Sequence, residues 1–238
     1  AGGLRPTVIA GDLSVRGEPL RIARAAEAAL GTIDVLVNNA GVQMFAAIGA
    51  GGDGDEGRAV METNFFAPLA LTAAVLPAMR ARRAGCIVQV TSLASTMPTP
   101  FAGHYAASKG ALANATEALR AELRGTGVHV VHVVPGPVET PMFAEGRAIA
   151  RDVIDGTPRG KPDRLARLVA RAIERRRRLV VYPRWTWIGR LWPSLALALA
   201  RRALRDVTLD PTSILAAGSR GSDATVRERR AASASASC

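Results

Sequence analysis

Short apolar runs alternate with longer helical runs along most of the chain, and this alternation restricts the fold more than any other feature. Each apolar run has the length of a buried strand, and a stretch of helical length separates it from the next. Such alternation is typical of a parallel sheet with helices on both faces, so we expect an α/β fold with a doubly wound parallel sheet. The expected strands are residues 35–37, 87–90, 130–134 and 179–182, and the expected helices are residues 21–30, 61–79, 105–124 and 164–176.

Tyr105 and Lys109 lie four positions apart in the run 105–124. Residues with this spacing share one face of a helix, about 6 Å apart along its axis, so the ammonium can lie near the phenol. An interaction of about 4 kcal/mol at 4 Å would lower the pKa of Tyr105 by roughly three units at most. We therefore expect a lowered pKa for Tyr105 and a role for its phenol as a general acid or base.

Other motifs accompany this pair in a fixed order. Ser92 follows the run 87–90 and lies thirteen positions before Tyr105. The run 35–37 continues as Asn-Asn-Ala-Gly, and the run 130–134 continues as Pro-Gly-Pro-Val-Glu-Thr. In order and spacing, these features resemble the short-chain dehydrogenase/reductase family over about residues 8–183. The fold that this resemblance implies is Rossmann-like.

The resemblance also implies a catalytic set and a cofactor. In the family, a tyrosine like Tyr105 transfers a proton, and a serine like Ser92 orients the substrate oxygen. A lysine like Lys109 holds the nicotinamide ribose and lowers the tyrosine pKa, and an asparagine like Asn64 anchors a water of the proton relay. A hydride moves between NAD or NADP and a secondary alcohol or carbonyl compound. The cofactor-binding residues implied by the resemblance are Asp12, Asn38, Ala40, Gly41, Tyr105, Lys109, Pro135, Gly136, Val138 and Thr140.

The start of the sequence departs from the family pattern. The family begins with a strand, a glycine-rich turn, a helix and a second strand, and we expect these units, on the order of 50 residues, to be absent here. In the strand order 3-2-1-4-5-6 they would lie between the strand-like run 7–10 and the strand 35–37. We therefore expect a fold that is incomplete at the N-terminus, with one flank of residues 35–37 unpaired and residues 7–10 separated from the sheet.

A substitute phosphate-binding turn is hard to find. Gly49-x-Gly51-x-x-Gly54 formally matches the dinucleotide fingerprint. The neighbouring acidic residues Asp53 and Asp55 would repel a pyrophosphate, so we interpret this stretch as a flexible loop beside the site. Residues 143–157 are expected to cover the substrate.

Composition fits one such domain in a reducing compartment. The 238 residues are 48% hydrophobic, and two cysteines give no disulfide framework, which favours a cytoplasmic location.

The net charge of +11 comes from a basic set in which only Lys109 and Lys161 are lysines. Arginine in an alanine-rich chain indicates compositional bias, and no recognition motif accompanies it, so we expect no nucleic-acid partner. No cluster of ligands at metal-binding spacing is present, so no metal is expected.

We divide the chain into a truncated Rossmann-like domain at 1–183, an apolar and basic amphipathic segment at 184–205, and a disordered tail at 206–238. Tryptophan and arginine in residues 185–205 suit peripheral contact with a membrane surface. An alternative of at least equal weight is that this segment packs over the substrate mouth or a neighbouring subunit.

The resemblance implies a homodimer or homotetramer formed through the helices that contain Met61 and Tyr105. The apolar segment hints at a lipophilic substrate. The alternative function is a truncated, catalytically inactive homologue that acts as an oligomerising or membrane-surface binding protein.

Overall fold

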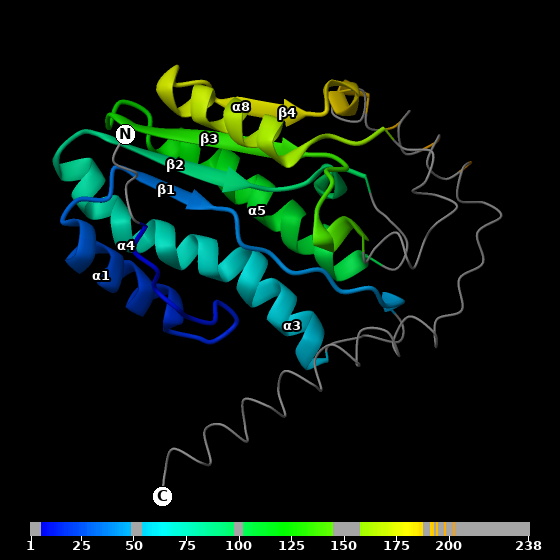
Figure 1. The fold of residues 1–238 in the computed structure, drawn as a ribbon, viewed down its shortest axis with the longest axis horizontal. Helices are drawn as coiled ribbons and strands as arrows, with labels where there is room; N and C mark the ends of the chain where they lie inside the picture. The colour runs from blue at the N-terminus through cyan, green and yellow to red at the C-terminus, as the bar shows by residue number, and fades with distance from the viewer. Residues whose placement is uncertain are drawn as a thin grey trace, which may run out of the picture.

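A single parallel sheet organises the molecule (Figure 1). The computed structural model describes residues 6–48, 54–97, 102–144 and 158–187, together with residues 191, 192, 194, 198 and 202. The strands pair in the order β1-β2-β3-β4, all parallel, with Ile87 opposite Val130 in the register. The expected strands are all present, and the α/β fold is confirmed. They are β1 (Val35–Asn38), β2 (Gly85–Val90), β3 (Val128–Pro135) and β4 (Leu179–Tyr182).

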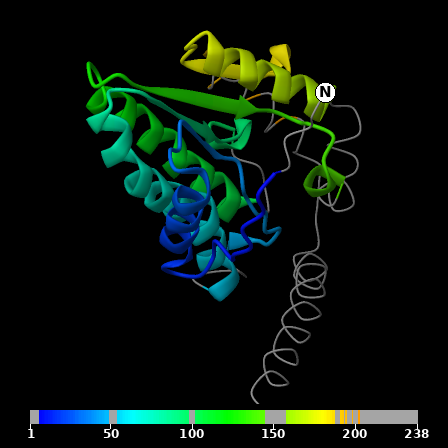
Figure 2. The same cartoon turned by 60° about the vertical axis from the view of Figure 1, so that its left-hand side comes forward.

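Helices connect successive strands and lie on both faces of the sheet (Figure 2). One long helical stretch between β1 and β2 runs without a break from α-helix through a π-helical segment and back to α-helix. The α-helices are α1 (Glu18–Leu30), α3 (Asp55–Met61), α4 (Ala67–Ala81), α5 (Gly103–Glu122) and α8 (Pro162–Glu174); η1 (Glu62–Phe66) is the π segment, and η2 (Leu93–Ser95) and η3 (Arg184–Thr186) are 3₁₀ turns.

Two apolar clusters fill the space above and below the sheet. Successive strand residues point to opposite faces, so one strand contributes to both clusters. On one face Ile87 and Val130 pack with Val75 and Met79 of α4. Helix α8 covers the opposite face, where Ala172 packs against alternate residues of the strands. The second cluster contains Cys86, Val88, Val131, Val133, Ala172 and Val180.

The sheet has an open edge at β1. This strand pairs with β2 alone among the described residues, and Val35 and Val37 are 39% and 47% exposed. The expectation of an unpaired flank is therefore confirmed. Residues 7–10 are separated from the sheet, as expected, and without a pairing partner among the described residues this strand-like run forms no strand; Val8 is 85% exposed.

The stretch Asp55–Ala81 is long and apolar enough to cross a membrane by length and composition. In this structure its buried residues, among them Asn64, Val75 and Met79, contact the sheet, α1 and α5. Val75 and Met79 of this stretch therefore belong to the core, whereas Phe66 is exposed.

Several expectations concern residues outside the described part of the chain. These are the glycine turn except Gly54, the cover segment from residue 145 to 157, most of the segment 185–205, and the tail.

Candidate active site

The carboxyl ends of β1, β2 and β3 lie at one edge of the sheet, as parallel pairing requires. Ser92 follows β2 by two residues, and its extended backbone begins the turn η2. Its Oγ accepts a hydrogen bond from the backbone N–H of Ala94 at 3.1 Å. This bond caps the turn and fixes the hydroxyl at the end of the central strand.

Tyr105 lies in the first turn of α5 and faces Ser92. Burial raises the pKa of Tyr105, and a hydrogen bond with the Ser92 side chain opposes part of this effect. The lowered pKa expected from the sequence is therefore wrong for this structure. The phenol is held in its neutral form, with a proton to donate.

Lys109 follows one turn later on α5 and is 4% exposed. Its Nζ donates a hydrogen bond to the carbonyl of Val90 at 3.0 Å, at the end of β2. Burial lowers the pKa of Lys109 to about 8. Because an ammonium that loses its hydration is less favourable, Lys109 sheds its proton more readily than an ordinary lysine.

Asn64 is fully buried in the π segment and ties three elements together. Its Oδ1 accepts from the N–H of Val42, and its Nδ2 donates to the carbonyl of Val42, both at 2.9 Å. Nδ2 also donates to Oγ of Ser108 at 3.0 Å. A Cβ on Gly41 would lie 3.2 Å from both Asn64 Oδ1 and Lys109 Nζ, so Gly41 leaves the space beside these groups open.

Asn38 and Asp12 have hydrogen-bond partners outside these four residues. Asn38 is buried at the end of β1, and its Nδ2 donates to Gln89 Oε1 at 3.1 Å, to Thr72 Oγ1 at 3.3 Å and to the carbonyl of Pro68 at 3.3 Å. Its side chain therefore fastens β1 to β2 and α4. Asp12 lies in the exposed turn before α1, where its carboxylate accepts two hydrogen bonds from Ser14. Ala40 is exposed in the loop after β1.

The segment after β3 is fixed at several points along its length. Gly136 donates its N–H to the carbonyl of Tyr182 at 2.8 Å, and a Cβ there would lie 2.3 Å from Thr186. Val138 forms an isolated bridge with Gly160, and Thr140 Oγ1 accepts from the N–H of Phe143. Residues 135–140 therefore form a defined wall at the end of β3.

Two sets of residues escaped the sequence reasoning. Ser108 is fully buried and donates its hydroxyl to the carbonyl of Tyr105 at 2.8 Å. It also accepts from Asn64, so it links Asn64 to the first turn of α5. Its position three residues after Tyr105 was the available signal. The second set joins Thr91 to His132 at 2.9 Å and His132 to Glu117 at 2.9 Å, directly beside Ser92. No cluster of three metal-ligand side chains occurs among the described residues.

Comparison with known proteins agrees with this geometry. The sequence profile of the short chain dehydrogenases matches residues 3–149. A short chain dehydrogenase of Pseudocercospora fijiensis is 39% identical over 150 residues, which cover 63% of this chain and 48% of that protein. The chain spans about half the length of the curated relatives it matches.

Two solved structures are similar in fold and in sequence. A short-chain dehydrogenase from Streptomyces avermitilis superposes with a TM-score of 0.67 at 26% identity, covering 84% of this chain and 80% of that one. A metagenomic short-chain oxidoreductase in complex with NADP gives a TM-score of 0.55 at 34% identity, covering 68% and 65%. The strand topology, the arrangement around Tyr105 and these matches together show that the chain belongs to the short-chain dehydrogenase/reductase family.

Proposed function

We propose that this protein transfers a hydride between NAD or NADP and a secondary alcohol or carbonyl compound. The observation that supports the proposal best is the hydroxyl of Tyr105 facing Ser92, with the ammonium of Lys109 one helical turn further along. Similar proteins have been solved with NADP, which supports the choice of cofactor class.

The residues beside Lys109 fit the nicotinamide ribose. A lysine ammonium has three N–H donors, and the carbonyl of Val90 accepts one of them. The other two can donate to ribose hydroxyls in the space that Gly41 leaves open. Residues 135–140 would hold the nicotinamide carboxamide. Among the described residues no glycine-rich turn receives the pyrophosphate, so the fit concerns the nicotinamide end of the cofactor.

The chemistry at the substrate oxygen follows from the side chains. When bound, the nicotinamide supplies or accepts the hydride. Tyr105 donates its phenolic proton to a carbonyl oxygen, or takes the proton of an alcohol in the reverse direction. Ser92 donates a hydrogen bond to the same oxygen and holds it in line. Lys109 stabilises the phenolate that forms, and Asn64 holds the loop after β1 beside Lys109.

Binding and turnover are tested by one pair of variants. The chain contains two tyrosines, Tyr105 and Tyr182, and the hydroxyl of Tyr182 accepts from the N–H of Lys161. We expect NADH or NADPH to change the protein fluorescence with saturation in the wild type, in Tyr105→Phe and in Tyr182→Phe. Turnover of a panel of secondary alcohols and ketones of increasing chain length should fall about 100-fold or more in Tyr105→Phe alone.

The opposite results would refute the proposal. Retained turnover in Tyr105→Phe would remove the proton-transfer role of this residue. Absence of saturable binding of either dinucleotide would favour the alternative of a catalytically inactive oligomerising or membrane-surface protein. Turnover that increases with the length of the substrate chain would support a lipophilic substrate.

The proposal extends to location and membrane contact. Cys86 is a buried free thiol, which suits a reducing cytoplasm, and Leu191 and Trp192 are 59% and 58% exposed. We propose a cytoplasmic protein whose segment 185–205 touches membrane surfaces. Co-sedimentation with lipid vesicles should fall when Trp192 is replaced by Ser. Unchanged co-sedimentation would favour packing of the segment on the substrate mouth or on a neighbouring subunit.

A further inference from the structure

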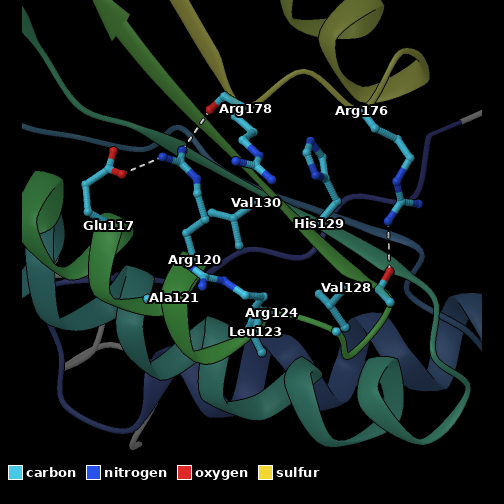
Figure 3. A pocket seen from close by; sticks show the side chains of 12 residues that line it. Glu117, Arg120, Ala121, Leu123, Arg124, Val128, His129, Val130, Arg176 and Arg178 are labelled. Atoms are coloured by element: carbon cyan, nitrogen blue, oxygen red, sulfur yellow. Dashed lines mark hydrogen bonds and ion pairs between the residues drawn. The ribbon is translucent and has the colours of Figure 1, made fainter.

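A basic cavity of about 360 Å³ lies at the end of the sheet opposite the candidate active site (Figure 3). It is lined by the end of α5, the turn into β3, the first residues of β3 and the turn between α8 and β4. His129 lines the cavity near the start of β3, and Pro135 ends this strand beside the site. At about 3.3 Å per strand residue, roughly 20 Å separate the two places, so the cavity is a second, independent feature.

The charges of the cavity are strongly unbalanced. Its lining includes the arginines 120, 124, 176 and 178 and a single carboxylate, that of Glu117. Glu117 already pairs with Arg120 and with Nδ1 of His132. The guanidinium groups of Arg124 and Arg178 have neither a carboxylate nor a hydrogen-bond acceptor among the described residues.

Backbone carbonyl groups around the cavity accept hydrogen bonds from the side chains of Arg120 and Arg176. Arg120 Nη2 donates to the carbonyl of Arg178 at 2.7 Å, and Arg176 Nη2 donates to the carbonyl of Gly127 at 3.0 Å. Arg176 itself has a positive φ of 49°, in the left-handed region that favours glycine. A Cβ on Gly127 would lie 2.0 Å from the carbonyl oxygen of Arg83, so this turn accepts glycine alone. The two turns are therefore fastened to each other through their arginines.

His129 reports the electrostatic potential inside the cavity. Burial lowers the pKa of His129, and the charges of Arg176, Arg120 and Arg178 lower it further, against a hydrogen bond to the carbonyl of Arg177 that raises it. Figure 3 shows the guanidinium of Arg178 directed into the space between Arg120 and the ring of His129. An anion in this space would contact the uncompensated charges.

We propose that this cavity binds a small anion that carries two or more phosphate groups. Guanidinium groups bind phosphate oxygens through paired N–H donors, and the positive charges here come from both walls of the cavity. We expect a single phosphate to contact one wall, and a diphosphate to contact both Arg124, which follows α5, and Arg178, which precedes β4. The volume lies within the range of small-molecule sites.

The test is a titration of the full chain with inorganic pyrophosphate at constant ionic strength, followed by NMR of the histidine rings. The chain has three histidines, so the signals of His129 can be assigned with one variant. We expect saturable shifts of the His129 signals and a raised pKa for its ring, with the signals of His104 unchanged. Orthophosphate should bind at least tenfold more weakly.

A matched pair of double variants distinguishes binding in the cavity from nonspecific electrostatic attraction of an anion to a basic protein. Arg124→Gln with Arg178→Gln should weaken pyrophosphate binding tenfold or more. Arg16→Gln with Arg24→Gln removes the same charge from exposed positions near and in α1 and should leave binding unchanged. Circular dichroism checks that both variants fold.

Three results would overturn the proposal. They are shifts that rise linearly without saturation, equal losses in both double variants, and equal binding of orthophosphate. Binding of NADH should survive in Arg124→Gln with Arg178→Gln, because the dinucleotide would bind at the other end of the sheet. A parallel loss of NADH binding would instead place pyrophosphate and the dinucleotide in one common site.

Discussion

At the scale of single residues, the proton chemistry depends on two opposed effects of burial. Burial raises the pKa of Tyr105 and lowers that of Lys109 to about 8. Both shifts disfavour charge at the site. A bound substrate oxygen or ribose hydroxyl would supply new hydrogen bonds to both groups, so we expect the charged forms to become more favourable when the site is filled.

Lys109 should destabilise the fold at neutral pH. Its pKa lies below the unfolded value of 10.5, so through Lys109 the unfolded chain binds more protons between pH 8 and pH 10.5, and Lys109 contributes a rise in the free energy of unfolding over this interval. Above pH 9 the pKa of Cys86, raised by burial from 9.0 to about 11, opposes this rise. The shift corresponds to a penalty on the order of 3 kcal/mol at pH 7, and loss of the bond to Val90 offsets about 1 kcal/mol. Lys109→Met should therefore unfold at higher urea at pH 7 and lack the rise above pH 8.

The chain provides its own control for this measurement. Lys161, the second of its two lysines, is exposed at the start of α8. Lys161→Met should leave both the midpoint and the pH dependence of urea unfolding unchanged. A Lys109→Met protein less stable than the wild type at pH 7 would contradict the assigned penalty.

At the scale of elements, the helical stretch between β1 and β2 shows how local helix geometry positions the side chain of Asn64. A π segment inserts one wider turn, and such segments are frequent at functional sites. Here the segment η1 contains Asn64, whose side chain holds both backbone groups of Val42. The loop after β1 is therefore fixed from the helix.

Asn64→Ala should be costly because it removes three hydrogen bonds of a fully buried side chain, one of them to the buried hydroxyl of Ser108. The N–H and carbonyl of Val42 and the hydroxyl of Ser108 would each lose a hydrogen bond, and we expect a loss of about 2–4 kcal/mol in the free energy of unfolding. Asn114→Ala is the matched control, since Asn114 is exposed on α5 and bonds only the carbonyl of Gly110. Urea denaturation measures both, and equal effects would show that Asn64 contributes no more than a surface residue.

Sequence patterns predicted the elements well where apolar residues determine them. The strand Leu179–Tyr182 was predicted to the residue, and the others within a few residues, because buried parallel strands are short continuous apolar runs. The π segment was missed, because residues 61–79 have the same apolar pattern in either helical form. The roles of Ser92, Tyr105, Lys109 and Asn64 stay predictions, although the structure brings these residues together.

Other features depend on contacts that no local pattern contains. The pKa of Tyr105 is raised because the phenol is buried, and this burial depends on tertiary packing. The basic cavity joins residues 117–130 to residues 176 and 178, so only the fold brings its two pairs of arginines together. The strand-like run 7–10 forms no strand, because a strand needs a neighbour with which to exchange hydrogen bonds.

At the scale of the whole molecule, two surfaces can drive self-association. One is the open edge of β1, where Val37 is 47% exposed. The other is the helical surface that includes Phe66 of η1, 49% exposed and in edge contact with Phe65. The family resemblance favours helices as the interface of a homodimer or homotetramer, whereas an unpaired strand edge favours strand pairing between copies.

Two single substitutions distinguish these surfaces. We expect Phe66→Ser to shift the protein toward the monomer, because it removes an exposed aromatic anchor from the helical surface. Val37→Lys, a charge on the strand edge, should leave the assembly intact. Size-exclusion chromatography with light scattering at several concentrations gives the mass of each. Monomers from Val37→Lys together with intact assemblies from Phe66→Ser would assign the contact to the strand edge instead.

The burial of Lys109 also affects how fast a lysine-specific protease can digest the native protein. The chain has two lysines: one is enclosed within α5, and the other, Lys161, precedes Pro162, a bond that such proteases cleave poorly. Digestion of the native protein therefore requires α5 to open around Gly110. The rate of cleavage at this bond would measure how often α5, the helix that bears Tyr105, unwinds.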